Sequence, residues 1–228
     1  MKPDIVRRYG HNPILTKAEI PYPVETVHNA AVVKHEDAYI MLFRSHLRTG
    51  RSIIGLARSP DGFHFTADPE PFLIPARDSP FAAYEEFGVE DPRVTRLEGE
   101  YIITYSAYSR HGVRIALAKT KDFSQVERVS LITQADYRNV VIFPEKFDGL
   151  YARLDRPHSA IAPWSIWISH IPPNLVVGPW VSHTILDTTT RYPHHVSSSP
   201  TAICMEMRHG TECQTDTPQP HHHRRFPR

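Results

Sequence analysis

The sequence predicts an all-β fold of the β-propeller type, on three observations. A pattern of apolar runs separated by polar turns occurs three times along the chain. The runs are short and rich in β-branched and aromatic residues, and Asp-Gly or Glu-Gly turns connect several of them, as in β-hairpins. Helical periodicity is scarce, and 21 prolines would interrupt most candidate helices.

The repeat is defined by three apolar runs in each copy, of which the second begins with a tyrosine. The runs occupy residues 30–33, 39–43 and 53–57, then 93–95, 101–105 and 113–118, then 140–143, 151–154 and 165–168. The leading tyrosines Tyr39, Tyr101 and Tyr151 stand at nearly equal distances from the polar turn that closes each copy. Repeated antiparallel sheets of this size are the units of a β-propeller, and a β-sandwich with coincidental spacing is the alternative.

Three copies predict about three blades, although propellers usually close with four to eight. Residues 1–182 are therefore expected to form a partial propeller that carries the catalytic site. Residues 183–228 lose apolar periodicity and are expected to be a low-complexity, disordered or out-of-frame tail. Within that tail Cys204, His209 and Cys213 have no standard zinc-ligand spacing, so no metal site is expected.

Composition excludes several classes of partner. Lys and Arg total 26 and Asp and Glu total 25, and this small charge difference does not favour binding to nucleic acid or to an anionic membrane. The first eight residues contain no apolar run of the signal-peptide kind, and no run of about 18 apolar residues occurs. A cytoplasmic location is therefore expected, and the sequence leaves a homo-oligomer open.

The strongest candidate for chemistry is the motif Gly88-Val89-Glu90-Asp91-Pro92-Arg93, which opens the second copy. Cleavage of a glycosidic bond requires a carboxylic acid near the departing oxygen, and this acidic pair would lie at the mouth of the propeller channel. Pro92 is expected to bias Asp91 toward an extended backbone conformation. A purely structural alternative is an Asx-type turn capped by Asp91.

Several arginines lie in or beside apolar strands, where they are costly unless they pair with an anion. Arg44 follows one such run, and Arg138 and Arg156 flank two others; the polar Asn29 also precedes an apolar strand. A planar guanidinium suits bidentate binding of phosphate or carboxylate. The alternative is that these arginines form internal ion pairs with Asp91, Glu145 or Asp155.

The motifs together resemble a known family. Asn12-Pro13-Ile14-Leu15, the motif at 88–93, and Phe143-Pro144-Glu145-Lys146 with Arg156-Pro157 are similar to successive motifs of glycoside hydrolase family 130. The resemblance covers roughly residues 10–180. It implies a five-bladed β-propeller that acts on β-mannosides, most members being inverting phosphorylases and some hydrolases.

This resemblance implies roles for individual residues. Asp91 matches the general acid, Asn29 and Arg44 match residues that hold the sugar, and Arg138 and Arg156 match residues that hold phosphate. Glu90 and Arg93, in the same motif as Asp91, are assigned to substrate binding. The implied reaction is attack by inorganic phosphate with inversion, giving α-mannose 1-phosphate from a β-mannooligosaccharide or mannosyl-glucose. Phosphate is then a co-substrate, and no metal or organic cofactor is implied.

Two departures from the family keep alternatives open. His28-Asn29-Ala30-Ala31 stands where the family usually has Asn-Pro-Gly-Ala, and the family's later Gly-rich, His and Glu positions have no counterpart after Trp180. The presence of both Arg138 and Arg156 favours a phosphorylase. A β-mannoside hydrolase, a non-catalytic carbohydrate-binding fragment, and an arabinan- or fructan-cleaving propeller are the alternatives. A three-bladed chain with open strand edges is expected to fold poorly and to have little activity.

Overall fold

The computed structural model describes residues 7–158, 165–171 and 183–186, and these residues are nearly all β. One short 3-10 helix, η1, spans Lys17–Glu19 ahead of the first sheet. The first blade is a four-stranded antiparallel unit in chain order. Its strands are β1 (His28–His35), β2 (Ala38–His46), β3 (Ser52–Ser59) and the two-residue β4 (Thr66–Ala67).

The second and third blades repeat this order of antiparallel pairing. The second consists of β5 (Gly88–Leu97), β6 (Glu100–Ser109), β7 (Gly112–Thr120) and β8 (Glu127–Leu131). The third consists of β9 (Tyr137–Phe147), β10 (Leu150–Pro157), β11 (Ile166–Ile171) and β12 (His183–Leu186). All nine apolar runs singled out in the sequence lie in or largely within strands, so the prediction of three blades is confirmed.

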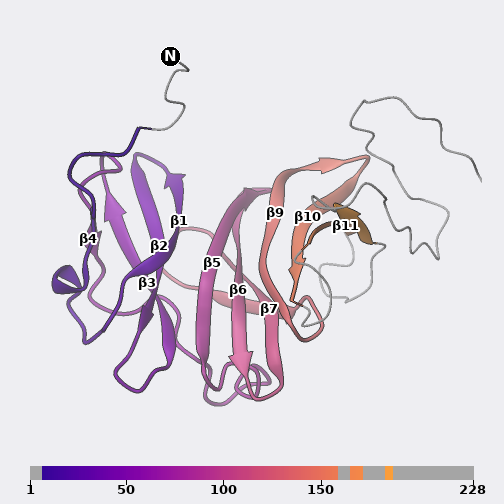
Figure 1. Cartoon of the computed structure of the whole chain (residues 1–228). Coiled ribbons are helices and arrows are strands. Elements are labelled where there is room, and N and C mark those ends of the chain that lie inside the picture. Colours follow the sequence, from indigo (N-terminus) through magenta and orange to yellow (C-terminus); the bar gives the residue numbers. More distant parts are fainter. Residues whose placement is uncertain (1–6, 159–164, 172–182, 187–228) are drawn as a thin grey trace, which may run out of the picture.

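The three blades stand side by side in chain order and do not close into a ring (Figure 1). The first two are joined by a single parallel bridge between Ser52 of β3 and Gly88 of β5. The second and third are joined by hydroxyls: Thr95 Oγ1 donates to the Ile142 carbonyl at 2.8 Å, and Thr104 Oγ1 donates to the Val140 carbonyl at 2.5 Å. In the described part of the chain, no helix has the length and apolarity needed to cross a bilayer.

The hairpin turns follow the sequence signals closely. Glu98 and Gly99, between β5 and β6, have φ of 50° and 84°; Asp148 and Gly149, between β9 and β10, have φ of 49° and 77°. Positive φ at both central residues is the requirement of a type I′ turn, whose twist matches the flanking strands. Glycine at the second position removes the steric cost of that conformation.

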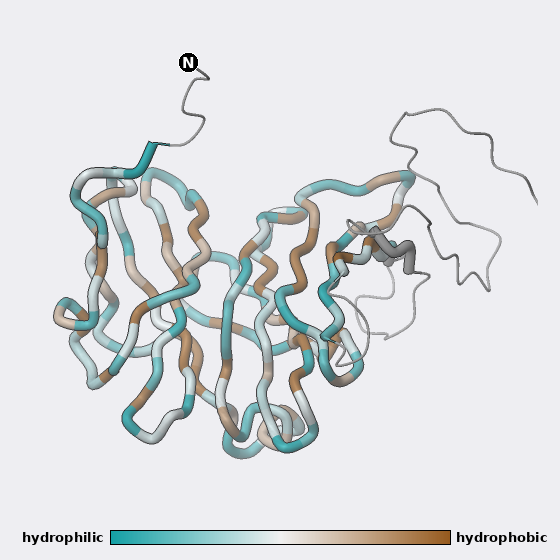
Figure 2. Tube along the Cα trace, in the orientation of Figure 1, coloured by the Kyte–Doolittle hydropathy of each residue, from teal (hydrophilic) through white to brown (hydrophobic). Residues whose placement is uncertain are grey.

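Apolar side chains are buried between neighbouring blades. One cluster joins Ile40, Leu42, Ile54 and Leu56 of the first blade to residues of the second, including Val89, Tyr101, Ile103 and Tyr105. A second cluster joins Ile115 and Leu117 of the second blade to Val140 and Ile142 of the third. In Figure 2 the apolar stretches lie within the strands and many of the polar stretches lie in the turns. The stacked blades therefore share cores, which fixes the relative position of their inner strands.

The third blade extends slightly past the boundary expected from the sequence. Residues 183–186 form β12 and pair antiparallel with β11, from Ser169↔His183 to Ile166↔Leu186. Backbone pairing with a neighbour satisfies the polar groups of a segment whose side chains show no apolar pattern. The rest of the expected tail, with Cys204, His209 and Cys213, lies outside the described residues.

Candidate active site

The inner strand of each blade begins with the same backbone irregularity. The strand register shifts between His28 and Ala31 in β1, between Glu90 and Arg93 in β5, and opposite Leu154 and Arg156 in β9. Within each shift one residue has a left-handed backbone: Asn29 with φ 49°, Asp91 with φ 52° and Asn139 with φ 56°. Asn and Asp are the non-glycine residues that adopt this conformation most readily.

The conformation of Asp91 corrects the expectation drawn from Pro92. A residue before proline usually has an extended backbone, but Asp91 has φ 52°. The bulge places an extra residue in β5, which bends the strand and redirects its side chains. Hydrogen bonds from the first blade hold the Asp91 carboxylate and offset the cost of this conformation, which is of order 1–3 kcal/mol.

Asp91, in the second blade, is held by side chains from the first and third blades. Its Oδ1 accepts hydrogen bonds from Asn29 Nδ2 at 2.8 Å and from Arg44 Nη1 at 3.1 Å. Its Oδ2 lies 3.5 Å from Asn139 Nδ2. The residue is only 7% exposed. These partners come from β1, β2 and β9. The Asp91 side chain therefore binds residues of other blades, and none of its described hydrogen bonds caps a local turn, which was the structural alternative.

Glu90 forms a second centre beside Asp91. Its Oε1 accepts from Arg44 Nη2 at 2.6 Å and from Ser52 Oγ at 3.0 Å, and its Oε2 accepts from Arg138 Nη1 at 3.1 Å. Arg44 therefore bridges the two carboxylates with different nitrogens of one guanidinium, a geometry available to arginine and not to lysine. The alternative of internal ion pairs is confirmed for Arg44 with Asp91.

Arg156 reaches this cluster through an asparagine. Its Nη2 donates to Asn139 Oδ1 at 2.5 Å, while Asn139 Nδ2 faces Asp91. Arg138 and Arg156 are opposite each other in the pairing of β9 with β10. The cluster thus contains the two carboxylates of Glu90 and Asp91 and the three guanidiniums of Arg44, Arg138 and Arg156. Guanidinium groups are well suited to bind an anion such as phosphate through two parallel hydrogen bonds.

The electrostatic surroundings favour the ionised form of Asp91. Burial raises the pKa of its carboxyl, but the hydrogen bonds from Asn29, Arg44 and Asn139 and the charge of Arg44 together outweigh burial, so the pKa is lowered. An aspartate with a lowered pKa is a carboxylate near neutral pH. It is therefore suited to accept hydrogen bonds from sugar hydroxyls and to act through a proton that a hydroxyl shares with it, rather than to hold a proton beforehand.

Arg93 was also assigned to the site, but its described hydrogen bond is not with the cluster around Asp91 and Glu90. Its Nη1 donates to the carbonyl of Pro92 at 3.0 Å, whereas Arg44 and Arg138 both bind Glu90. The register shift at the bulge lies between Glu90 and Arg93, and Arg93 resumes regular pairing opposite Thr104.

Sequence reasoning missed Asn139, Ser52 and His46, which contact Asp91, Glu90 and Arg44 respectively. A signal for Asn139 existed in the repeat. His28-Asn29, Glu90-Asp91 and Arg138-Asn139 occupy the same place at the start of their copies, and alignment of the copies on these pairs would have identified Asn139. Ser52 and His46 belong to the β2–β3 hairpin and carry no such signal.

Two partly exposed aromatic rings lie beside the cluster. Phe87 and Tyr108 are 40% and 37% exposed, and their ring centroids are 5.3 Å apart in an edge-on arrangement. The guanidinium of Arg138 lies 5.8 Å from the centroid of Tyr108 while it binds Glu90. Arg138 therefore contacts both Glu90 and an aromatic ring that exposes apolar surface.

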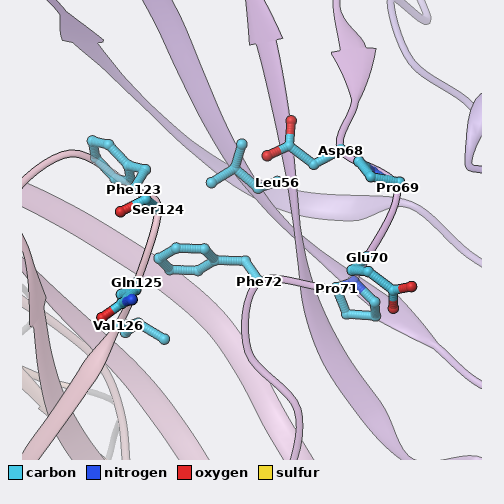
Figure 3. Close-up of a pocket in the computed structure, with 10 residues that line it drawn as sticks. All are labelled: Leu56, Asp68, Pro69, Glu70, Pro71, Phe72, Phe123, Ser124, Gln125 and Val126. Atoms are coloured by element: carbon cyan, nitrogen blue, oxygen red, sulfur yellow. The ribbon is translucent and has the colours of Figure 1, made fainter.

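A different pocket lies between the first and second blades, away from these residues. Figure 3 shows the rings of Phe72 and Phe123 beside it, with Leu56 and the segment from Asp68 to Pro71. Its carboxylate Asp68 is ion-paired with Arg58 at 3.2 Å, and Arg58 also donates to the Phe123 carbonyl at 3.4 Å. None of the predicted site residues lines this pocket, so it is not the candidate active site.

The blades and their central side chains define a β-propeller protein with acidic and basic groups gathered at the start of the inner strands. The chain belongs to glycoside hydrolase family 130: the family model described as beta-1,4-mannooligosaccharide phosphorylase matches residues 2–184. This is a family of β-mannoside phosphorylases, and the resemblance inferred from the motifs is confirmed.

Characterised relatives carry phosphorylase names. The chain is 44% identical to the Beta-1,2-mannobiose phosphorylase of Listeria innocua over 125 residues, which is 54% of this chain and 34% of that protein. It is 31% identical to the 4-O-beta-D-mannosyl-D-glucose phosphorylase of Bacteroides fragilis over 143 residues, covering 57% and 35%. The match to the Listeria protein thus spans about a third of that protein's length.

Solved structures agree on the fold. The Listeria innocua Beta-1,2-mannobiose phosphorylase, solved with β-1,2-mannobiose, superposes with a TM-score of 0.67 at 28% identity, covering 78% of this chain and 65% of that one. A family member described as a glycoside hydrolase that targets β-1,2 mannosidic linkages in Candida mannan gives a TM-score of 0.65 at 20% identity, covering 86% and 63%. The neighbours in this family are five-bladed propellers, and the chain covers part of that fold.

Proposed function

We propose that the chain is the part of an inverting β-mannoside phosphorylase that carries its acid and two of its phosphate-binding arginines. The observation that supports this most directly is the convergence of Asp91, Glu90, Arg44, Arg138 and Asn139 from three blades at one place. A carboxylate beside guanidiniums suits a reaction in which an anion attacks a sugar.

In this proposal Asp91 assists departure of the leaving sugar. Because its pKa is lowered, Asp91 is ionised in the free site, so the proton for the leaving sugar enters with dihydrogen phosphate. Asp91 takes up that proton and passes it to a mannosyl hydroxyl, which gives its own proton to the glycosidic oxygen as the bond breaks. Asn29 and Arg44 both donate to Oδ1 of Asp91 and are proposed to bind the same sugar residue. Acid assistance of this kind contributes about 10²- to 10⁴-fold to rate.

Arg138 and Arg156 are proposed to hold inorganic phosphate opposite the leaving group. Phosphate is already an anionic nucleophile, so it requires orientation and charge neutralisation rather than a base. Attack on the anomeric carbon forms the C–O bond to phosphate as the glycosidic bond breaks. The products are α-mannose 1-phosphate and a sugar shortened by one mannose, and no metal or organic cofactor enters the reaction.

The substrate is proposed to be a β-mannooligosaccharide, with β-1,2-mannobiose as the first choice. The relative with 44% identity is named for that disaccharide, and another relative is named for mannosyl-glucose. The exposed rings of Phe87 and Tyr108 offer apolar surface for a sugar face next to Glu90.

The test is product analysis with the 228-residue chain and β-1,2-mannobiose, with and without inorganic phosphate. The proposal predicts slow release of α-mannose 1-phosphate that depends on phosphate. Release of free mannose at the same rate without phosphate would identify a hydrolase instead. Binding of mannobiose with no product under either condition would identify a carbohydrate-binding fragment, and cleavage of arabinan or sucrose would identify the third alternative.

A further inference from the structure

The hydrogen-bonding state of one histidine can be deduced from its neighbours. His46 Nε2 lies 3.0 Å from Arg44 Nη2, and His46 Nδ1 lies 3.0 Å from Thr26 Oγ1. A guanidinium has only donors, so Nε2 must be the acceptor in the first contact. The imidazole is then neutral with its proton on Nδ1, and Nδ1–H donates to the hydroxyl of Thr26.

Thr26 is placed to fix this tautomer. Its Oγ1 also accepts from the backbone N–H of His46 at 3.0 Å, so two donors of one residue converge on one hydroxyl oxygen. The His28 ring stacks on the imidazole of His46, with the two ring centroids 5.2 Å apart and an interplanar angle of 27°. Burial and then the charge of Arg44 lower the pKa of His28, so His28 also favours the neutral form.

The acceptor on His46 completes the surroundings of Arg44. The guanidinium donates through Nε to Ser52, through Nη1 to Asp91, and through Nη2 to both Glu90 and His46. A planar group bound to four acceptors has one orientation, and in that orientation it bridges the two carboxylates. We propose that His46, in the Nδ1–H form set by Thr26, is a positioning residue that holds Arg44 against Asp91 and Glu90.

This inference rests on the proposed function for its consequence on rate, but not for the tautomer. The first test is imidazole ¹⁵N NMR of the 228-residue chain at pH 8, with the His46 signals assigned by comparison with His46→Gln. The expected result is a protonated Nδ1 and a bare Nε2. A His46 ring with its proton on Nε2, the commoner tautomer of a free imidazole, would overturn the proposal whether or not the chain turns over substrate.

The second test compares three variants in phosphorolysis of β-1,2-mannobiose. His46→Leu removes the acceptor and is expected to lower kcat by about 10- to 100-fold with a smaller change in KM, because a charged donor loses its partner. His46→Gln keeps an acceptor oxygen and is expected to recover most of that loss. His64→Gln is the control, since His64 is exposed and pairs with Asp61 in a distant turn.

Equal kcat values for His46→Leu and His64→Gln would also overturn the proposal. A failure of the proposed function has a different signature, because the wild-type chain would then give no phosphorolysis at all while the Nδ1–H tautomer of His46 persisted.

Discussion

Asn29 Nδ2 donates to Asp91 Oδ1 at 2.8 Å, although the two residues are 62 positions apart and belong to different blades. Both stand in a left-handed bulge at the start of an inner strand, and Asn139 occupies the same place in the third blade. Equivalent positions of the repeat thus provide the central carboxylate and an amide on either side of it. An amide supports an ionised carboxylate, whereas a second carboxylate at the same place would oppose it.

This contrast predicts the effect of Asn29→Asp. The substitution places two carboxylates within hydrogen-bonding distance, where like charges cannot both be ionised without cost, so the pKa of Asp91 should rise from its lowered value. Titration of ¹³C-labelled aspartate carboxyl groups by NMR measures the change. An unchanged Asp91 titration in the variant would contradict the arrangement described.

The same substitution has a consequence for stability. A folded-state pKa below the unfolded value of about 3.9 means that the Asp91 carboxylate stabilises the fold above that pH, and that this contribution is lost as the pH falls through the folded-state pKa. Because Asn29→Asp raises the folded-state pKa, the variant should lose free energy of unfolding at pH 6, relative to wild type, more than at pH 3. Urea unfolding at the two pH values tests this order.

Two adjacent glutamates offer a matched pair for the role of burial. Glu85 is 0% exposed and accepts from Tyr105, from both Nε and Nη2 of Arg128, and from the Ala76 backbone. Glu85→Gln should lower the free energy of unfolding by about 3 kcal/mol, because the Arg128 charge loses its partner in a buried site.

Glu86 next to it pairs with Arg110 at the surface, where Arg110 is 69% exposed. Glu86→Gln should therefore leave stability nearly unchanged, since exposed ion pairs are screened by water. Thermal and urea unfolding of both variants measure the difference. Equal destabilisation by the two substitutions would show that the Glu85 network does not hold the segment before β5.

Two glycines with positive φ offer a second matched pair. A Cβ on Gly88 would lie 2.5 Å from Ser52 N and 2.8 Å from Ser52 Cβ, at φ 144°, where the first and second blades touch. Gly88→Ala should cost about 3 kcal/mol, because both backbone strain and a clash with main-chain atoms must be relieved.

Gly99 has φ 84° in the β5–β6 turn, with nothing within 4 Å of an added Cβ. Gly99→Ala should cost about 1 kcal/mol from backbone strain alone. Differential scanning calorimetry of the two variants measures this contrast. A larger loss for Gly99→Ala would mean that the contact between Ser52 and Gly88 does not constrain the blades.

The sequence predicts the fold well because the signals that define a blade are local. Alternating apolar runs and Glu98-Gly99 or Asp148-Gly149 turns specify hairpins without reference to distant residues. The outermost strands carry weaker signals: Thr66–Ala67 is too short to show a period, and His183–Leu186 pairs through its backbone.

The site is less predictable because it depends on backbone conformations that no local rule gives. The proline rule predicts an extended Asp91, whereas the structure has a left-handed bulge there, in an inner strand, β5, that lies against both β1 and β9. The motif identifies Glu90 and Asp91, but their partners Ser52 and Asn139 come from other blades, and Arg93 from the same motif binds the Pro92 carbonyl instead. Proximity in sequence therefore overstates the role of Arg93 and understates that of Asn139.

The central claim concerns one carboxylate, and a matched substitution tests it directly. The measurement is the rate of phosphate-dependent α-mannose 1-phosphate formation from β-1,2-mannobiose for Asp91→Asn and for Asp61→Asn, an aspartate that caps an exposed turn through Phe63 and His64. The account predicts a loss of about 10³-fold for Asp91→Asn and none for Asp61→Asn. A wild-type rate in Asp91→Asn would contradict it.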